Sequence, residues 1–417
     1  MMRMRRLILL ALLASSAPAA QATTLDEAIA AALAHAPAIE AARAESDAAA
    51  ARVREAQAGQ LPTATVTGTI GWGRLDPQSF FGLGAANVTP RAAQVTVEQP
   101  LFTGGRVSAG IAQARAGDEA AKARENMTRS QTIAAVAQAY GNVLTGRELV
   151  ALQSELVAQM QEIARQAQLR YKAGESPRTD ISQAAARLAE AEAALAAAQG
   201  HAIAANARFT NLTGLTPDDL APLPANPALP AALDEALDAA LQTNPSLAQA
   251  EAGLRAAQAA ARAARAERLP TVGAFAEGAL VRDQFFPDYR ADSATVGVRA
   301  RWQLFNPGTS ARVAGSDSAV TAAEARLKAA QDMVREQVIA TFQAVRTSLL
   351  VEAAAQRQAD AAAQARDSIR HEVHVGMKPQ LDLLDAEREA TAARAALARA
   401  QADRATAAYQ LLALIGQ

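Results

Sequence analysis

The sequence predicts a mainly α-helical protein that also carries transmembrane β-strands, with the whole arrangement present twice in 417 residues. Three observations predict this fold class. The two halves of the chain resemble each other, and each half has a long proline-free tract that stops at a glycine and a proline. Each half also has a segment in which apolar and polar residues alternate. The first observation indicates duplication, the second long helical hairpins, and the third strands.

The duplication is clearest near the start of each half. Thr24–Ala42 matches Ala232–Ala250 without a gap, and Leu61-Pro62 corresponds to Leu269-Pro270. A proline-rich stretch joins the halves, which is typical of a linker. The expected organisation is a signal peptide over residues 1–22, a first repeat over 23–214, a linker over 215–231 and a second repeat over 232–417. Each repeat is expected to run helix, two strands, long helix, tip and helix, with the strands at about 61–105 and 269–306.

The first residues predict export. A basic head is followed by an apolar core at Leu7–Leu13 and by the small-residue sequence Ala20-Gln21-Ala22, which together form a secretory signal peptide. The alternative of a membrane anchor is weak because the apolar core is too short to span a bilayer. Beyond this segment we find no unbroken apolar run of 18 residues, so we expect no transmembrane helix. The destination is then the periplasm, the outer membrane or the medium.

Charge and cysteine content exclude several functions. The formal net charge is −1, and losing the three arginines of the leader leaves 38 basic against 42 acidic residues. This balance argues against a nucleic-acid partner. The chain has no cysteine, so it has no disulfide framework, no thiolate metal site and no lipidated cysteine.

Two very long helices are expected from the absence of proline. There is none between Pro100 and Pro177 or between Pro307 and Pro379, and these tracts are rich in the good helix formers Ala, Glu, Gln and Arg. About 68 residues of helix would extend roughly 100 Å. Apolar residues recur every three or four positions, as in a coiled coil: Ile133, Val136, Tyr140, Val143, Leu149, Leu152, Leu156, Met160 and Ile163, then Val338, Phe342, Val345 and Leu349.

Each long helix is expected to end in a tight helical tip. Gly174 is followed three residues later by Pro177, and Gly376 by Pro379. Glycine tolerates the left-handed conformation that ends a helix, and proline suits the first turn of the next one. Both sites therefore predict a reversal between two helices.

Alternating residues between the helices predict the strands. In residues 63–72 and 293–304 apolar positions alternate with Thr, Ser, Gly, Arg or Gln, and Val95 and Val97 support a third strand. Val272–Leu280 gives a weaker fourth. Strands of about ten residues with one apolar face suit a tilted crossing of the membrane.

Aromatic residues support a membrane setting. Two Trp, four Tyr and nine Phe are present, and ten of these 15 lie in the strand segments. Such clustering at strand ends is typical of the girdles at a membrane interface, whereas the alternative is a small soluble sheet with an aromatic core. The ten are Trp72, Phe80, Phe81, Phe102, Phe275, Phe285, Phe286, Tyr289, Trp302 and Phe305.

Four strands cannot close a barrel. An open edge in lipid leaves backbone groups unpaired at several kcal/mol each, so the chain must share its barrel with other copies. Two copies would give eight strands and three would give twelve, and only the larger barrel leaves a useful water-filled interior.

The two tips, YKAGESPRTDISQA and HVGMKPQLDLLDA, and the sequence PLFTGGR after a strand resemble those of the outer membrane efflux proteins, the TolC-like outer membrane factors. The resemblance covers essentially the whole mature chain. It implies a homotrimer in which a 12-stranded β-barrel in outer membrane lipid continues into a long α-helical coiled-coil barrel in the periplasm. It also implies a periplasmic adaptor protein and an inner-membrane transporter as partners, and export without chemistry or cofactor.

The resemblance assigns a periplasmic gate. Asp382 and Asp385 match the aspartates that ring the family's constriction, and their spacing of three places both carboxylates on one helix face. Thr179 and Asp180 match positions that hold the tip closed, where an arginine of the second half reaches across. Lys378 stands at that arginine's place and keeps the charge, but it lacks the two-pronged guanidinium.

The tip residues resemble points where the adaptor docks, although Glu175 stands where an apolar residue is common in the family. These residues are Gly174, Glu175, Ser176 and Pro177 in the first half, and Gly376, Met377 and Pro379 in the second.

Other functions are weaker interpretations. A periplasmic adaptor would have one hairpin and soluble β-domains, and a secreted coiled-coil protein would not need alternating segments with clustered aromatics. His371 and His374 lie three residues apart and could bind a metal, but ordinary surface histidines are the commoner case. No nucleophile, base and orienting group share a recognisable motif, so we do not expect an enzyme.

Overall fold

The computed structural model describes residues 22–76, 84–224 and 227–416. The expected signal peptide lies outside the described residues except for Ala22, as do Phe80, Phe81 and residues 225–226 of the linker. Most described residues are in helices, and four long strands form one sheet, which confirms the predicted mainly helical class with four strands.

The chain forms two compact units, and each unit takes elements from both halves of the sequence. The first, here called the tip unit, takes the described residues within Met1–His35, Thr132–Pro227 and Thr347–Ala407. The second, the strand unit, takes those within Ala36–Gln131, Ala228–Arg346 and Ala408–Gln417. The long helices α3 (Arg106–Lys172) and α7 (Pro307–His374) contribute to both.

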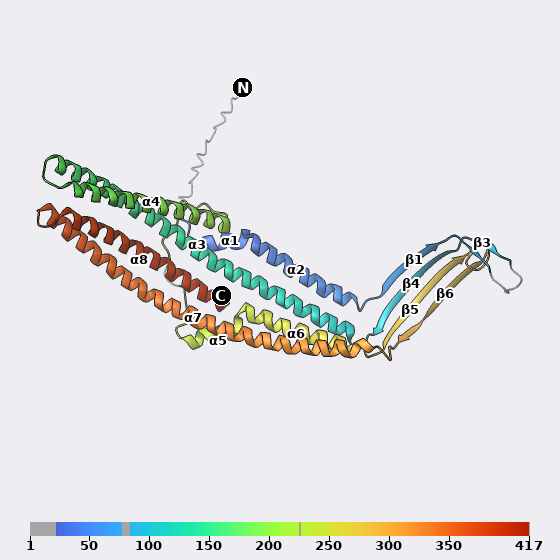
Figure 1. The fold of residues 1–417 in the computed structure, drawn as a ribbon. Helices are drawn as coiled ribbons and strands as arrows, with labels where there is room; N and C mark the ends of the chain where they lie inside the picture. The colour runs from blue at the N-terminus through green and yellow to red at the C-terminus, as the bar shows by residue number, and fades with distance from the viewer. Residues whose placement is uncertain (1–21, 77–83, 225–226, 417) are drawn as a thin grey trace, which may run out of the picture. The chain divides into compact units, whose positions relative to one another are not determined.

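The main sheet of the strand unit has the order β1-β4-β5-β6, with every neighbouring pair antiparallel (Figure 1). Its strands are β1 (Thr63–Ile70), β4 (Arg91–Phe102), β5 (Thr271–Arg282) and β6 (Arg290–Arg301). Strands β4 and β5 come from different halves of the sequence, so their pairing joins the two repeats. Strands β1 and β6 form the edges of this sheet. A small additional pair, β2 (Gly73–Leu75) with β3 (Ala86–Val88), flanks residues 77–83 and was not expected from the sequence.

The strand register separates the sheet into an apolar and a polar face. Val66 lies opposite Val95, and Ala276 lies opposite Val296, so the valines of β1, β4 and β6 at these positions share one face. Val66 is 75% exposed and Val296 is 84% exposed in the single chain. A row of valines in this position suits lipid rather than water. The opposite face carries the threonines of β1 together with Gln94, Thr96, Glu98, Glu277, Thr295, Arg299 and Arg301.

Phe275 belongs to the polar face, as do Ala279 and Val281 of the same strand. Its ring lies 4.5 Å from the guanidinium carbon of Arg299 and packs over Gly297 of the neighbouring strand. A Cβ at Gly297 would lie 3.1 Å from the ring, so a larger residue there would displace Phe275. Phe275 therefore does not contribute to a lipid-facing aromatic girdle.

The helices of the strand unit are α2 (Pro37–Ala58), α5 (Leu233–Thr243), α6 (Pro245–Ala266) and the first parts of α3 and α7. Of these, α2, α6 and α7 begin at a proline, which suits the first helical turn. Asn244, only 4% exposed, accepts hydrogen bonds from the backbone N–H groups of Ser246 and Leu247. Its side-chain amide also donates to the carbonyl of Leu414, which fixes the end of α8 (Gln380–Leu414) beside the start of α6.

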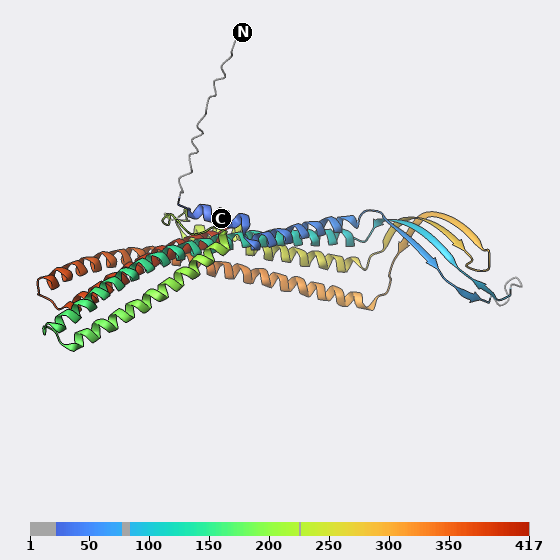
Figure 2. The ribbon, with the colours of Figure 1, turned by 90° about the horizontal axis from the view of Figure 1, so that it is seen from above.

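The tip unit contains two helical hairpins and the short helix α1 (Leu25–His35). Helix α4 (Arg178–Thr213) returns beside the second part of α3, and α8 returns beside the second part of α7 (Figures 1 and 2). Small residues let some helices approach closely: a Cβ at Gly141 would lie 3.0 Å from the Cβ of Ala402.

Tyr140 anchors this unit. It is fully buried, packs edge-on against Phe209, and its hydroxyl lies 2.8 Å from the carbonyl oxygen of Thr23 and 2.6 Å from that of Ala221. Burial raises the pKa of Tyr140 to about 12, because the charged phenolate would lose its hydration. One side chain thus holds the segments around Thr23 and Ala221 against α3.

One described helix, α7, is long and apolar enough over part of its length to cross a membrane, judged by length and composition alone. Residues 307–374 contain no unbroken run of 18 apolar residues, so the expectation that no helix spans a membrane stays a prediction. A coiled-coil helix that packs on several sides has the same composition.

Candidate functional site: the two helical tips

The two tips have the same backbone geometry, which the glycines make possible. Gly174 has φ of 79° and Gly376 has φ of 76°, a left-handed conformation that residues with a Cβ rarely adopt. The N–H of Glu175 donates to the carbonyl of Arg170 at 2.8 Å, and the N–H of Met377 donates to that of Glu372 at 2.8 Å. These bonds satisfy the last carbonyls of α3 and α7, as in a Schellman motif.

After each glycine the proline starts the returning helix. Pro177 is the N-cap of α4, and the N–H of Asp180 donates to its carbonyl at 3.2 Å. In the second tip the N–H of Asp382 donates to the carbonyl of Pro379 at the same distance. The two reversals are therefore built alike.

The surfaces of the two tips differ in character. Met377 is 76% exposed, and Val375 beside it is also exposed, so the second tip presents apolar side chains. The first tip presents Glu175, whose carboxylate lies 3.9 Å from Arg170 in the last turn of α3. Ser176 is half-buried, whereas Gly174, Pro177 and Pro379 are exposed.

Lys378 makes an ion pair within its own tip. Its Nζ lies 3.0 Å from Oε2 of Glu372. Thr179 and Asp180 are exposed on the first turn of α4, and the described residues of one chain show no ion pair between Asp180 and Lys378. A single chain thus leaves Asp180 available to a residue from elsewhere.

Asp385 belongs to a network that links α4 and α8. Its Oδ1 lies 3.8 Å from Nη2 of Arg187, and Arg187 also contacts Glu190 at 2.9 Å. Arg388 contacts the same Glu190 at 3.5 Å, so two arginines and two carboxylates alternate between the helices. Asp382 is half-buried one turn away and has no ion pair among the described residues. The two predicted gate carboxylates therefore have different electrostatic surroundings.

This network forms the rim of a hollow of about 200 Å³ between α3, α4 and α8. Its floor is apolar and includes Leu156, Met160 and Leu384, which belong to a buried cluster with Ala191 and Ile163. The apolar packing sets the spacing of the helices, and the charged residues lie where the helices meet solvent. The ion pairs contribute little to stability because they are exposed.

Sequence reasoning missed a third acidic residue on α8 near the tip, Glu387. Glu387 is buried and pairs with Arg370 of α7, and this hydrogen bond raises the pKa of the Arg370 guanidinium above its usual value. Its spacing in the sequence could have indicated a separate role, because Glu387 lies on a different face of α8 from Asp382 and Asp385. The pair joins α7 to α8, just as the Arg187 network joins α4 to α8.

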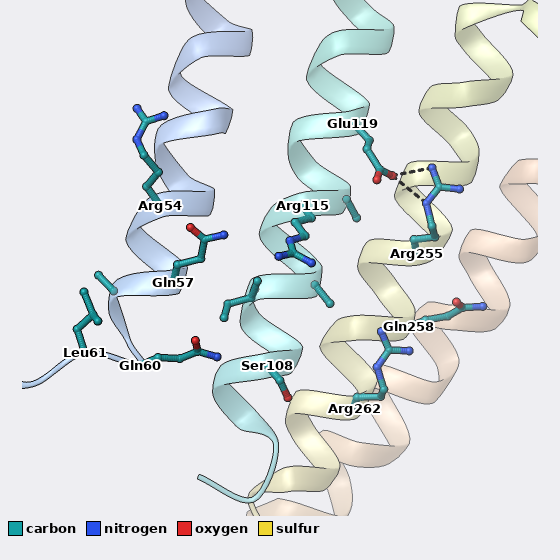
Figure 3. Close-up of a pocket in the computed structure, with 14 residues that line it drawn as sticks. Arg54, Gln57, Gln60, Leu61, Ser108, Arg115, Glu119, Arg255, Gln258 and Arg262 are labelled. Atoms are coloured by element: carbon teal, nitrogen blue, oxygen red, sulfur yellow. Dashed lines mark hydrogen bonds and ion pairs between the residues drawn. The ribbon is translucent and has the colours of Figure 1, made fainter. Parts of the chain in front are cut away.

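A basic hollow of about 890 Å³ lies on the helices of the strand unit (Figure 3). It is lined by α2, α3 and α6, where Arg255 makes an ion pair with Glu119 at 2.8 Å and the exposed Arg54, Arg115 and Arg262 face solvent. Its lining residues include no histidine or cysteine and only one serine, Ser108. They do not form a nucleophile and base pair.

The histidines near the second tip form no metal centre among the described residues. His371 and His374 lie in the last turn of α7, and in the described ranges no group of three or more His, Asp or Glu side chains could hold a metal ion. Two imidazoles alone fall short of the three or four protein ligands that zinc sites use.

Comparison with known proteins decides the family. The sequence profile of the outer membrane efflux proteins matches residues 28–215 and 236–417, which is most of both repeats. The chain belongs to the outer membrane efflux protein family. This confirms the resemblance inferred from the tips.

Curated relatives agree with this family. The outer membrane efflux protein BepC of Brucella suis is 30% identical over 331 residues, which are 78% of this chain and 71% of BepC. The alkaline protease secretion protein AprF of Pseudomonas aeruginosa is 27% identical over 327 residues, or 75% of this chain and 67% of AprF. Protein CyaE of Bordetella pertussis is 31% identical over 282 residues, covering 66% of this chain and 56% of CyaE.

Solved structures of similar fold are also channels of the outer membrane. The outer-membrane channel OprN superposes with a TM-score of 0.81 at 23% identity, covering 94% of this chain and 89% of OprN. The CmeC outer membrane channel of Campylobacter jejuni gives 0.82 at 14% identity, covering 94% and 85%. At these identities the likeness shows the fold.

As a member of the outer membrane efflux family, the protein resides in the outer membrane with its helical part in the periplasm.

Proposed function

We propose that three copies of this chain form the outer-membrane duct of a tripartite efflux or type I secretion system. One observation carries the proposal: the sheet has an exposed apolar face and two open edges, β1 and β6, which membrane lipid would leave without hydrogen-bond partners. Pairing β6 of one copy with β1 of the next satisfies both edges. Three sheets of four strands then give a barrel of 12 strands, which encloses a water-filled passage.

The polar face of the sheet supports this arrangement. Closing the barrel with the valines outward places Gln94, Glu277 and Arg299 on the inside. A lumen lined by such side chains is wetted by water, and the alternation of strand residues leaves the lipid side apolar. The helices would continue the passage into the periplasm as a coiled-coil barrel.

The tips supply the proposed gate and docking points. Three copies would bring six carboxylates from Asp382 and Asp385 to one constriction, and crowded carboxylates attract cations. Thr179 and Asp180 of one copy would face Lys378 of another, which would first have to leave Glu372.

A periplasmic adaptor would dock on the tips, and an inner-membrane transporter would supply the driving force and choose the cargo. The exposed Met377 offers an apolar contact to the adaptor on the second tip. The relatives include proteins named for efflux and for protease secretion, so the duct could serve either class of transporter. We infer that the chain itself performs no chemistry.

Purification in detergent and insertion into planar bilayers tests this proposal. We expect a particle with the mass of three chains that conducts ions in discrete steps. The double variant Asp382→Ala with Asp385→Ala should weaken block by divalent cations applied from the helical side. A water-soluble monomer without conductance would refute the duct, and unchanged block in the double variant would remove the two aspartates from the gate.

A further inference from the structure

Three arginines lie side by side at the far end of the sheet, away from the helices of the same unit. Arg91 of β4 lies opposite Arg282 of β5, and Arg282 lies opposite Arg290 of β6. The next residue in this row is Ile70 of β1. Even spacing along each strand places all three on the same face as Val66, Val95 and Val296. The arginine row therefore lies on the apolar face that we assign to lipid.

The arginine row carries more positive than negative charge. Asp292 on the same face makes an ion pair with Arg282 at 2.6 Å, and Arg282 also donates to the carbonyls of Val281 and Ala291. Arg91 and Arg290 make no ion pair among the described residues. Like charges on directly opposed residues disfavour sheet pairing unless a counter-charge is present. Three guanidinium groups and one carboxylate leave an excess of two positive charges.

Two further acidic residues, Asp283 and Asp288, lie in the hairpin turn between β5 and β6. Asp283 accepts a hydrogen bond from the backbone N–H of Asp288, which shapes the turn. Phe285, Phe286 and Tyr289 of the same turn pack edge to face, with ring centroids 5.0 and 5.2 Å apart. An aromatic cluster directly beyond the row is typical of a membrane interface.

The distance between the arginine row and the helical end of the sheet, measured along the strands, matches the thickness of the apolar part of a bilayer. From Arg290 to Ala300 the strand β6 rises about 33 Å, at 3.3 Å per residue. A tilt of about 40° reduces this to about 25 Å, the usual height of the apolar band of a barrel. Trp302 and Phe305 mark the other boundary, next to α7. The row therefore lies at the level of the headgroups of the leaflet opposite the periplasm.

We propose that Arg91 and Arg290 bind the phosphate groups of a phosphorylated lipid in the outer leaflet. Two strand spacings of about 4.8 Å separate them, so both side chains can reach one headgroup. Guanidinium groups bind phosphate through two parallel hydrogen bonds. Arg282, held by Asp292, occupies the position between them and adds to the positive potential. The inference rests on insertion of the sheet in the outer membrane, and a trimer would carry three such sites.

The test uses the intact protein in detergent and a lipid with removable phosphates. The probe is diphosphorylated lipid A, compared with the same lipid after both phosphates are removed, and bound lipid is measured by native mass spectrometry. Arg91→Gln with Arg290→Gln should weaken binding of the diphosphorylated lipid by about tenfold, which corresponds to about 1.4 kcal/mol. Arg290→Gln alone, a change of one exposed side chain on the edge strand, should weaken binding several-fold.

A matched control is Arg301→Gln, which removes an exposed arginine from the polar face near the helical end of the same strand. It should bind the lipid as the parent does. Equal binding by the parent and the double variant, or equal binding of the two lipids, would overturn the site while conductance of the parent still supports the duct. Absence of conductance in the parent would instead count against the duct itself.

Discussion

Removing the positive partner of Asp385 should make the channel more sensitive to divalent cations. Arg187→Gln uncovers one carboxylate per chain near the proposed constriction, since Arg187 is the only ion-pair partner of Asp385 among the described residues. Glu190 keeps Arg388 as its partner, so the network is not left with two uncovered carboxylates. The pair is more than a third exposed on both sides, so loss of the contact itself should hardly change stability.

The magnitude follows from Coulomb's law. One unit charge about 8 Å from a divalent cation in water contributes about 1 kcal/mol, and salt at physiological strength roughly halves this value. Three copies would together contribute about 1.5 kcal/mol, so the concentration of Mg²⁺ that blocks half of the current should fall about tenfold. The assay is single-channel recording in planar bilayers with Mg²⁺ added to the helical side.

Arg165→Gln is the matched control. Arg165 is an exposed arginine on α3 whose partner is Glu162 of the same helix, at 2.6 Å. Its removal also uncovers a carboxylate, but one outside the Arg187 network. The reasoning would be refuted if Arg187→Gln and Arg165→Gln had the same half-blocking concentration as the parent.

Three further predictions concern the tips and the core. Lys378→Ala should raise the leak current of the closed channel if Lys378 latches neighbouring chains, and equal leak in the variant and the parent would place the latch elsewhere. Gly376→Ala forces an alanine into a left-handed conformation at a cost of about 1–2 kcal/mol, so trypsin should cut faster after Arg370, near this tip. The variant Gly110→Ala, inside α3, should be cut no faster than the parent. Tyr140→Phe removes the hydroxyl shared by two carbonyls and should lower the free energy of unfolding by about 1–3 kcal/mol. Because the folded-state pKa of Tyr140 is raised, the parent should also lose stability as pH rises from about 10 to about 12, and a phenylalanine variant with the same alkaline profile as the parent would contradict this assignment.

The helices and strands could be predicted because their signals are local. A glycine and a proline three residues apart mark each tip. The positive φ angles of Gly174 and Gly376 show why each tip needs glycine. Alternation of valine and threonine gave the faces of the strands, which the register of Val66 and Val95 bears out. Such patterns depend on backbone chemistry within a few residues, so a single sequence contains them.

Contacts between distant elements could not be predicted in this way. Arg187 and Asp385 are almost 200 residues apart, and neither residue carries a sign that the other is its partner. The pair of Arg370 with buried Glu387 was missed for the same reason. The arginine row depends on the register of three strands, since Arg91 and Arg282 come from different repeats. The assignment of Asp382 and Asp385 to the gate came from the family resemblance. A pair of aspartates on one face of a helix is usually only exposed to solvent, so the sequence pattern alone did not indicate a gate.

Disulfide crosslinking of the sheet edges tests the shared barrel most directly. The chain has no cysteine, so Val66→Cys on β1 can be combined with a cysteine at 294, 296 or 298 on β6 without background. The account predicts crosslinked dimers and trimers on denaturing gels for at least one of these pairs. No crosslink is expected when Val66→Cys is combined with Ala276→Cys on β5, which already has a neighbour on both sides. Monomers throughout the β6 panel, in protein that remains soluble without detergent, would contradict the account.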